Sequence, residues 1–153
     1  MNYEHTMNHE DTKTQSHEAM QSPDGKHSPV PAKTEQLAKQ VIGAALEVHQ
    51  TIGPGFPESV YEHALSLELN AWGVEHRRQA PITIHYRRTI VGEGRVDMLV
   101  GDCLVVELKT VEALADVHRS QAVAYLKALN LRLGLLINFH QAILKDGIKR
   151  VIN

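Results

Sequence analysis

Three ionisable residues, Asp97, Glu107 and Lys109, lie at one end of an otherwise apolar stretch of the chain. The apolar segments Val96–Val100 and Cys103–Leu108 flank a Gly-Asp pair, which is typical of a β-hairpin. Because side chains alternate along a strand, Glu107 and Lys109 share one face of the second strand. Two carboxylates can hold Mg²⁺, and a neighbouring lysine can orient a water molecule or stabilise negative charge on a phosphate. This pattern favours metal-dependent hydrolysis of phosphodiester bonds.

The register of this hairpin decides whether the two carboxylates can share an ion. A two-residue turn at Gly101-Asp102 would pair Asp97 with Val106, and Glu107 would then face away from Asp97. A common metal site needs Asp97 opposite Glu107, which requires a three-residue loop ending at Cys103 or a bulge in the ladder. We predict this second register, because bulges are frequent beside active sites.

Three further motifs occur in order around the hairpin. Their residues are Gly55, Glu58 and Tyr61 upstream, Gln121 and Tyr125 downstream, and then the strand Gly134–Phe139. With these motifs the chain, from roughly Lys33 to its C-terminus, resembles the GxxExxY family within the PD-(D/E)XK nuclease superfamily. The resemblance implies an α/β fold with a restriction-endonuclease-like core of order α-β-β-β-α-β, in which helices flank a mixed sheet.

The resemblance also implies the parts of an active site. The implied catalytic residues are Asp97, Glu107, Lys109, Glu58, Gln121 and Tyr125. The implied ligands of Mg²⁺ or Mn²⁺ are the carboxylates of Asp97, Glu107 and Glu58 and the carbonyl of Leu108. Lys109 would orient or deprotonate the attacking water, while Gln121 and Tyr125 would help to place the lysine and the nucleic-acid backbone. We therefore expect a metal-dependent nuclease whose partner is nucleic acid; DNA is the favoured substrate and RNA stays open.

A second hypothesis is a catalytically silent module that binds nucleic acid or protein on a nuclease-derived fold, because a fold does not establish an activity. The weak basic character of the chain favours this module, whereas the complete set of ionisable motif residues favours the nuclease. Hydrolysis based on His49, His63 or His118 lacks a nucleophile or an orienting partner at a recognisable spacing. We expect His118 to be a hydrogen-bonded histidine at a helix start.

Composition and charge indicate the number of domains, the extent of the tail and the location of the protein. The 153 residues, of which 42% are hydrophobic, suffice for one domain. Residues 1–32 are polar and hold five acidic and two basic residues, so we predict a disordered tail before a single nuclease-like domain over 33–153 with a net charge of +1. The chain has no apolar run of membrane-spanning length and no secretion signal, which predicts a cytoplasmic protein without a membrane partner. A homodimer or a protein partner stays open.

Periodicity and turn residues predict the elements that position the motifs. The predicted helices are about Glu35–Gln50 with Thr34 as N-cap, Pro57–Trp72, and Asp116–Leu129 with Asp116 as N-cap. The further predicted strands are Ile82–Tyr86 and Thr89–Glu93, turning at Arg87-Arg88, then Leu133–Phe139 and an edge strand Ile148–Ile152. Composition alone predicts Tyr61 at the edge of the core with its hydroxyl in water.

The third predicted helix carries an informative interruption. Its apolar stripe, Val117, Ala124 and Ala128, is broken by Gln121 and Tyr125, which lie one turn apart. A glutamine on a buried stripe is costly unless it is hydrogen-bonded. We therefore expect Gln121 to face a polar site or a satisfied buried network.

Overall fold

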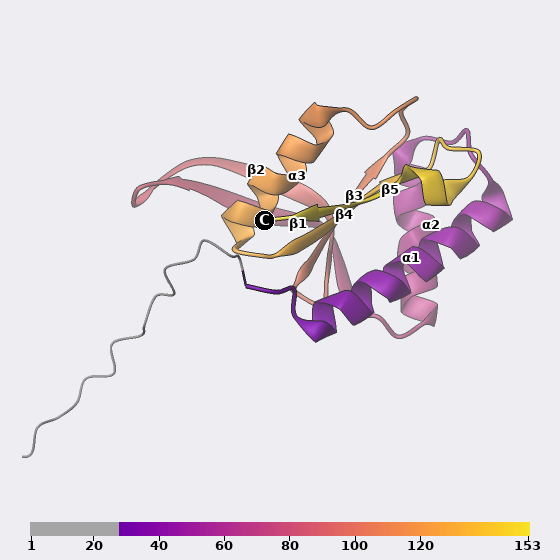
Figure 1. The fold of residues 1–153 in the computed structure, drawn as a ribbon, viewed down its shortest axis with the longest axis horizontal. Helices are drawn as coiled ribbons and strands as arrows, with labels where there is room; N and C mark the ends of the chain where they lie inside the picture. The colour runs from indigo at the N-terminus through magenta and orange to yellow at the C-terminus, as the bar shows by residue number, and fades with distance from the viewer. Residues whose placement is uncertain (1–27) are drawn as a thin grey trace, which may run out of the picture.

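The computed structural model describes residues 28–153, so most of the predicted polar tail lies outside the described residues. The elements in chain order are α1 (Ala32–Ile52), α2 (Glu58–Ala71), β1 (His76–Tyr86), β2 (Thr89–Val100), β3 (Leu104–Lys109), α3 (Asp116–Leu129), β4 (Leu133–Asn138), the 3₁₀-helix η1 (Leu144–Gly147) and β5 (Ile148–Ile152) (Figure 1). Within these residues, no helix combines the length and the apolar composition needed to cross a bilayer.

The five strands form one mixed sheet in the order β1-β2-β3-β4-β5. Strands β1, β2 and β3 form an antiparallel meander, β3 and β4 are parallel, and β5 returns antiparallel to β4. The parallel pair requires a crossover, which α3 supplies. The predicted α/β fold, with a mixed sheet flanked by helices, is confirmed, and the predicted edge strand at the C-terminal end is present.

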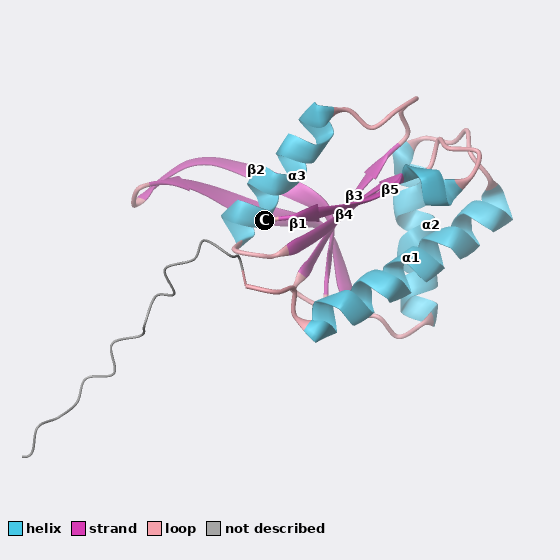
Figure 2. Ribbon diagram, in the orientation of Figure 1, coloured by secondary structure: helices cyan, strands magenta, loops and turns pink. Residues whose placement is uncertain are grey.

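Helices cover both faces of the sheet (Figure 2), and each face has its own apolar core. Helices α1 and α2 pack on the face that includes Met98, Val106 and Leu108. Helix α3 packs on the opposite face, which includes Leu99 and Val105. Every residue of β4 is buried, as the continuous apolar run of this strand predicted.

The β1–β2 hairpin is much longer than predicted. The turn at Arg87-Arg88 is confirmed, but β2 runs without interruption from Thr89 to Val100, where two separate strands, Thr89–Glu93 and Val96–Val100, were predicted. Pro81 lies in β1, which is an edge strand, so its missing N–H removes no bond from the centre of the sheet. The distal half of the hairpin extends beyond the helices (Figure 1).

Helix α1 begins earlier than predicted, so the assignment of Thr34 as N-cap is wrong. Pro31 is the N-cap residue, and its carbonyl accepts a hydrogen bond from Glu35 N at 3.1 Å. Thr34 is inside the helix and only 2% exposed. The backbone of a residue after proline is free to enter a helix, and Ala32 does so. Helix α3 ends at Leu129 as predicted, but its N-cap is Ala115 rather than Asp116.

The buried stripe of α3 was assigned to the wrong face. Ala122 and Leu126 are the buried residues of this helix, whereas Val117 is 68% exposed. Ala124 and Ala128 are exposed as well. Leu126 is the only leucine in the middle of the helix, and the large side chain sets which face turns to the sheet because it has more apolar area to bury than an alanine.

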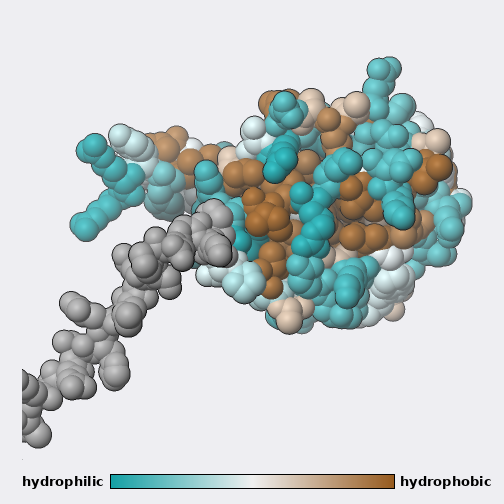
Figure 3. Space-filling model, viewed as in Figure 1, coloured by the Kyte–Doolittle hydropathy of each residue, from teal (hydrophilic) through white to brown (hydrophobic). Residues whose placement is uncertain are grey.

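Edge strand β5 is protected by charged side chains. Lys149 and Arg150 are exposed, and the Arg150 guanidinium forms an ion pair with Glu35 of α1 at 2.7 Å. Apolar residues gather over β5 and α1 on the face shown in Figure 3, between polar side chains. Charges along an edge strand disfavour pairing with the edge of another sheet.

Candidate metal and active site

The predicted carboxylates lie where β2 and β3 separate. The β2–β3 pairing is Val100 with Leu104, Leu99 with Val105 and Met98 with Val106, and the ladder ends there. The loop therefore has three residues, Gly101 to Cys103, as predicted. Its tight turn is possible because Gly101 and Asp102 both adopt positive φ, at 56° and 57°. One position beyond the last pair, Asp97 and Glu107 face each other in register.

The two carboxylates bridge the gap between the separating strands. Asp97 N donates to Glu107 Oε1 at 3.0 Å, and Leu108 N donates to Asp97 Oδ2 at 2.8 Å. Side-chain oxygens thus accept from backbone N–H groups that the regular ladder no longer pairs. The backbone of β2 therefore holds the Glu107 carboxylate, and the backbone of β3 holds the Asp97 carboxylate.

Burial and mutual repulsion make this cluster electrostatically strained. Glu107 is 5% exposed, and burial, followed by repulsion from Asp97, raises its pKa from 4.5 to about 7. Burial also raises the pKa of Asp97, an effect that the Leu108 N–H partly offsets. The pKa of Glu58 is raised mainly by burial, while the Lys109 ammonium lowers it and Asp97 raises it further. A cation placed among these groups would favour their ionised forms.

Tyr61 fixes the loop that leads into α2 and its first residue, the exposed Glu58. This tyrosine is fully buried and stacks on Phe139, with ring centroids 4.4 Å apart. Its hydroxyl donates to the carbonyl of Gly53 and accepts from Phe56 N at 3.3 Å. The prediction that the hydroxyl lies in water is therefore wrong, because two backbone groups of the loop satisfy it. Glu58 is the first residue of α2 and follows directly from this loop.

Lys109 ends β3, where it pairs with Asn138 of β4. Its side chain is half-buried, and its ammonium acts on the titration of Glu58, Asp97 and Glu107. The loop that follows is held by Asn138, which is fully buried: its side chain accepts from Val111 N and donates to Val111 O. The end of β3 that carries the lysine is therefore well fixed.

Gln121 and Tyr125 lie on α3 and bind each other, with Gln121 Nε2 donating to Tyr125 Oη at 3.0 Å. Gln121 is exposed, so of the two expected surroundings the buried network is wrong, for the same reason that the buried stripe was misplaced. Tyr125 packs over Gly94 of β2. Among the described residues, no hydrogen bond joins Gln121 or Tyr125 to Asp97, Glu107 or Lys109.

Two residues that the sequence did not single out also belong to the cluster. Glu62 lies one turn after Glu58 on the same face of α2, and its spacing of four residues could have identified it. Gln79 of β1 donates to both Glu62 oxygens, at 3.1 and 3.2 Å, and to Asp97 Oδ1 at 3.5 Å. His118 accepts from Ala115 N at 3.0 Å, which confirms its expected helix-start role.

The donors present fit a hard divalent cation. Asp97 and Glu107 offer carboxylate oxygens, and the Leu108 carbonyl is adjacent in the chain. Oxygen ligands of this kind, with the remaining positions left to water, suit Mg²⁺ and Mn²⁺. Over residues 28–153, no group of three or more His, Cys, Asp or Glu side chains is arranged to hold a metal.

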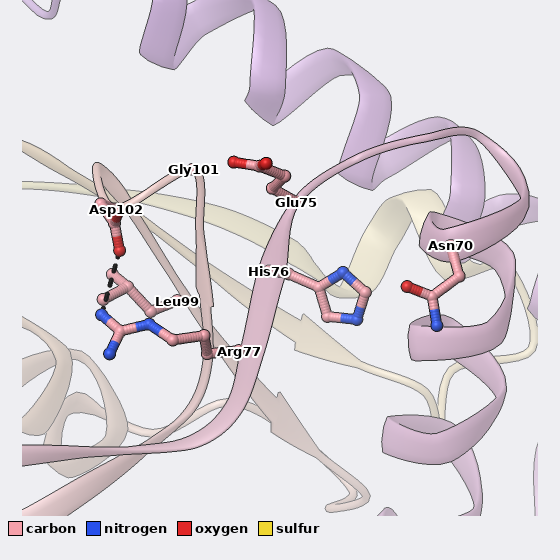
Figure 4. Close-up of a pocket in the computed structure, with 7 residues that line it drawn as sticks. All are labelled: Asn70, Glu75, His76, Arg77, Leu99, Gly101 and Asp102. Atoms are coloured by element: carbon pink, nitrogen blue, oxygen red, sulfur yellow. Dashed lines mark hydrogen bonds and ion pairs between the residues drawn. The ribbon is translucent and has the colours of Figure 1, made fainter.

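A hollow lies elsewhere on the sheet, away from the paired carboxylates. A pocket of about 410 Å³ is lined by Asn70, Glu75, His76, Arg77, Leu99, Gly101 and Asp102 (Figure 4). It includes the Arg77–Asp102 ion pair at 3.0 Å. The β2–β3 loop forms part of its wall, so it lies at the end of the hairpin opposite to the paired carboxylates. None of the predicted site residues lines this pocket.

Comparison with known proteins identifies one family. A family model described as the PD-(D/E)XK nuclease superfamily matches residues 35–151, which is nearly the whole described chain. No curated protein and no solved structure gave a match. The matched range contains Glu58, Asp97, Glu107 and Lys109 together.

Proposed function

Because this chain belongs to the PD-(D/E)XK nuclease superfamily, we propose that it is a metal-dependent nuclease of the GxxExxY type that hydrolyses phosphodiester bonds in DNA. The observation that carries the proposal is the reciprocal bonding of Asp97 and Glu107 where β2 and β3 separate. Lys109 follows Glu107 by two residues on the same strand, so the family's Asp…Glu-x-Lys order coincides with one local cluster.

Each side chain in the cluster has a task that its position supports. Asp97, Glu107 and the Leu108 carbonyl would hold Mg²⁺ or Mn²⁺, with Glu58 facing them from α2. The bound cation would lower the pKa of a coordinated water and polarise a phosphoryl oxygen. Lys109 would orient the attacking water or stabilise charge on the phosphate. Its half-buried ammonium is close enough to lower the pKa values of the Glu58, Asp97 and Glu107 carboxyl groups.

Glu107 also controls when the site can bind metal. With a pKa of about 7, its carboxyl group is partly protonated at neutral pH, and the proton must leave before both oxygens can act as ligands. Gln121 is exposed on α3, so its side chain is free to meet a substrate. We assign Gln121 and Tyr125 to contacts with the nucleic-acid backbone.

Nuclease assays test the proposal directly. Purified protein is incubated with labelled single- and double-stranded DNA and RNA in Mg²⁺, Mn²⁺ or chelator. We expect cleavage of DNA that requires metal and is lost in Lys109→Ala, with an unchanged melting temperature because a half-buried lysine at a strand end contributes little to the core. Lys39→Ala, which removes an exposed lysine of α1, is the matched control and should cleave as wild type does. Equal activity of the Lys109 variant would refute the mechanism.

A catalytically silent module is the second candidate, favoured because no three His, Cys, Asp or Glu side chains of the described residues are arranged to hold a metal. Calorimetric titration with Mn²⁺ separates the two. The nuclease requires binding that Glu107→Ala abolishes, whereas a silent module would bind nucleic acid in the presence of chelator and show no Mn²⁺ binding. RNA cleavage without DNA cleavage would keep the chemistry but correct the substrate.

A further inference from the structure

Gln79 has an unusual backbone conformation for a residue inside a strand. Its φ is +49°, in the left-handed region, where a long side chain is disfavoured. The β1–β2 ladder pairs Arg78 with Met98 and Ala80 with Val96, but it contains no pair between Gln79 and Asp97. The distortion therefore lies directly beside the carboxylate proposed to bind metal.

The distortion reverses which face of the sheet the neighbouring side chains occupy. Residues two apart in a strand normally share a face. Met98, however, packs with α1 and α2, whereas Val96 packs in the core under α3. On the paired strand, Arg78 contacts Glu62 of α2, and Ala80 packs in the core under α3. Both strands thus change sides at Gln79 and Asp97.

The side chain of Gln79 uses this position to contact two acidic groups. Its amide nitrogen lies 3.1 and 3.2 Å from the Glu62 oxygens and 3.5 Å from Asp97 Oδ1. The other oxygen of Asp97 already accepts from Leu108 N. Asp97 is therefore held from both sides, by the backbone of β3 and by a neutral donor on β1. Glu62 is held in turn by Arg78, with Nε and Oε1 3.5 Å apart.

We propose that Gln79 is a positioning residue that fixes the Asp97 carboxylate toward Glu107, acting as a neutral donor bridge between Asp97 and Glu62. The inference rests on the proposed function, because it assigns Asp97 to the metal. A glycine would adopt the same backbone without steric cost, whereas Gln79 adopts it against the preference of a long side chain. Strained conformations of this kind persist where surrounding structure uses them, as at binding sites.

The substitution Gln79→Gly separates positioning from folding. Glycine keeps the left-handed backbone and removes the bridge, so the metal-free variant should melt at or above the wild-type temperature. Its Mn²⁺ dissociation constant should rise and its rate of DNA cleavage should fall, each by about 10-fold or more. This is the range seen when residues that orient metal ligands are removed. Arg87→Gly is the matched control, because Arg87 also has positive φ, at 58°, but lies at the distal turn of the hairpin.

Three measurements on the full chain decide the matter: the melting temperature without metal, Mn²⁺ affinity by calorimetry, and cleavage of DNA. Weaker Mn²⁺ binding in Gln79→Gly with an undiminished melting temperature, and unchanged Mn²⁺ binding in Arg87→Gly, would support the inference. Wild-type Mn²⁺ affinity in Gln79→Gly would overturn it while leaving the nuclease proposal intact. A melting temperature that falls together with affinity would also overturn it, since the side chain would then be structural. If wild type does not cleave DNA but Gln79→Gly still binds Mn²⁺ more weakly than wild type, the positioning role is supported and the nuclease proposal is refuted.

Discussion

The substitution Glu107→Gln should stabilise the metal-free protein, because the buried carboxylate opposes folding when it is ionised. Glutamine has nearly the volume of glutamate, and its carbonyl oxygen can still accept from Asp97 N as Glu107 Oε1 does at 3.0 Å. The substitution therefore removes the charge while keeping the packing and the hydrogen bond. The repulsion that Glu107 shares with Asp97 and Glu58 disappears as well.

The pKa of Glu107 gives the magnitude and the sign. A rise from 4.5 to about 7 means that the folded state binds the proton more tightly than the unfolded chain does. Stability from protonated Glu107 is fully present below pH 4.5 and is lost as the pH rises through about 7. At 1.36 kcal/mol for each pH unit, the loss amounts to about 3 kcal/mol above that range. Glutamine avoids the loss, so its advantage should be absent in acid and complete in mild alkali.

Thermal unfolding of the two proteins across this pH range is the assay. About 3 kcal/mol corresponds to a rise in melting temperature of about 6–12 °C for a chain of this size. Glu93→Gln, which neutralises an exposed carboxylate of β2, is the control and should change little. Added Mn²⁺ should stabilise wild type but not Glu107→Gln. If Glu107→Gln is no more stable than wild type above pH 7, then burial does not penalise the ionised carboxylate, and the electrostatic argument for a cation site fails.

Three further predictions test other parts of the site. Tyr61→Phe should lose about 1–3 kcal/mol in urea unfolding, because the Gly53 carbonyl and Phe56 N lose their partner, whereas an unchanged midpoint would show that water replaces the hydroxyl. Gly101→Ala should lose about 1–2 kcal/mol by thermal unfolding, since its φ is 56° and a Cβ there would lie 2.5 Å from a methyl group of Leu37 that must move; wild-type stability would refute this. Mn²⁺ should bind more tightly and release fewer protons as the pH rises past 7, and a flat calorimetric profile would contradict the need for deprotonation.

The parts of the fold that the sequence predicted well are those with large apolar side chains or strong turn residues. The strand that became β4 was predicted from a run of apolar residues, and all of β4 is buried. The three-residue loop after Val100 was predicted from the requirement that two carboxylates share a face, and the ladder has that register. In contrast, the alanine-rich helix α3 offered several weak stripes, and only the position of Leu126 against the sheet decides among them.

The parts of the site that the sequence did not predict depend on backbone conformation and on contacts between distant segments. Nothing in the type of Gln79 indicates positive φ, because glutamine seldom adopts it. The hydroxyl of Tyr61 meets Gly53 and Phe56 only because the loop before α2 folds back over the helix. Glu62 becomes part of the cluster only when α2 packs beside β1, which brings it to Arg78.

The energetics of the cluster bear on the proposed metal site. The hydrogen bonds that Asp97 and Glu107 accept where the strands separate could be accepted equally by the amide oxygens of Asn and Gln, without charge. Carboxylates at these two positions add repulsion and desolvation, seen as raised pKa values for both. The charge of Lys109 does not remove this penalty, because burial outweighs the lowering effect of the lysine on the pKa of each group. Two charges that oppose folding, and that one divalent cation would relieve together, support the proposed metal site.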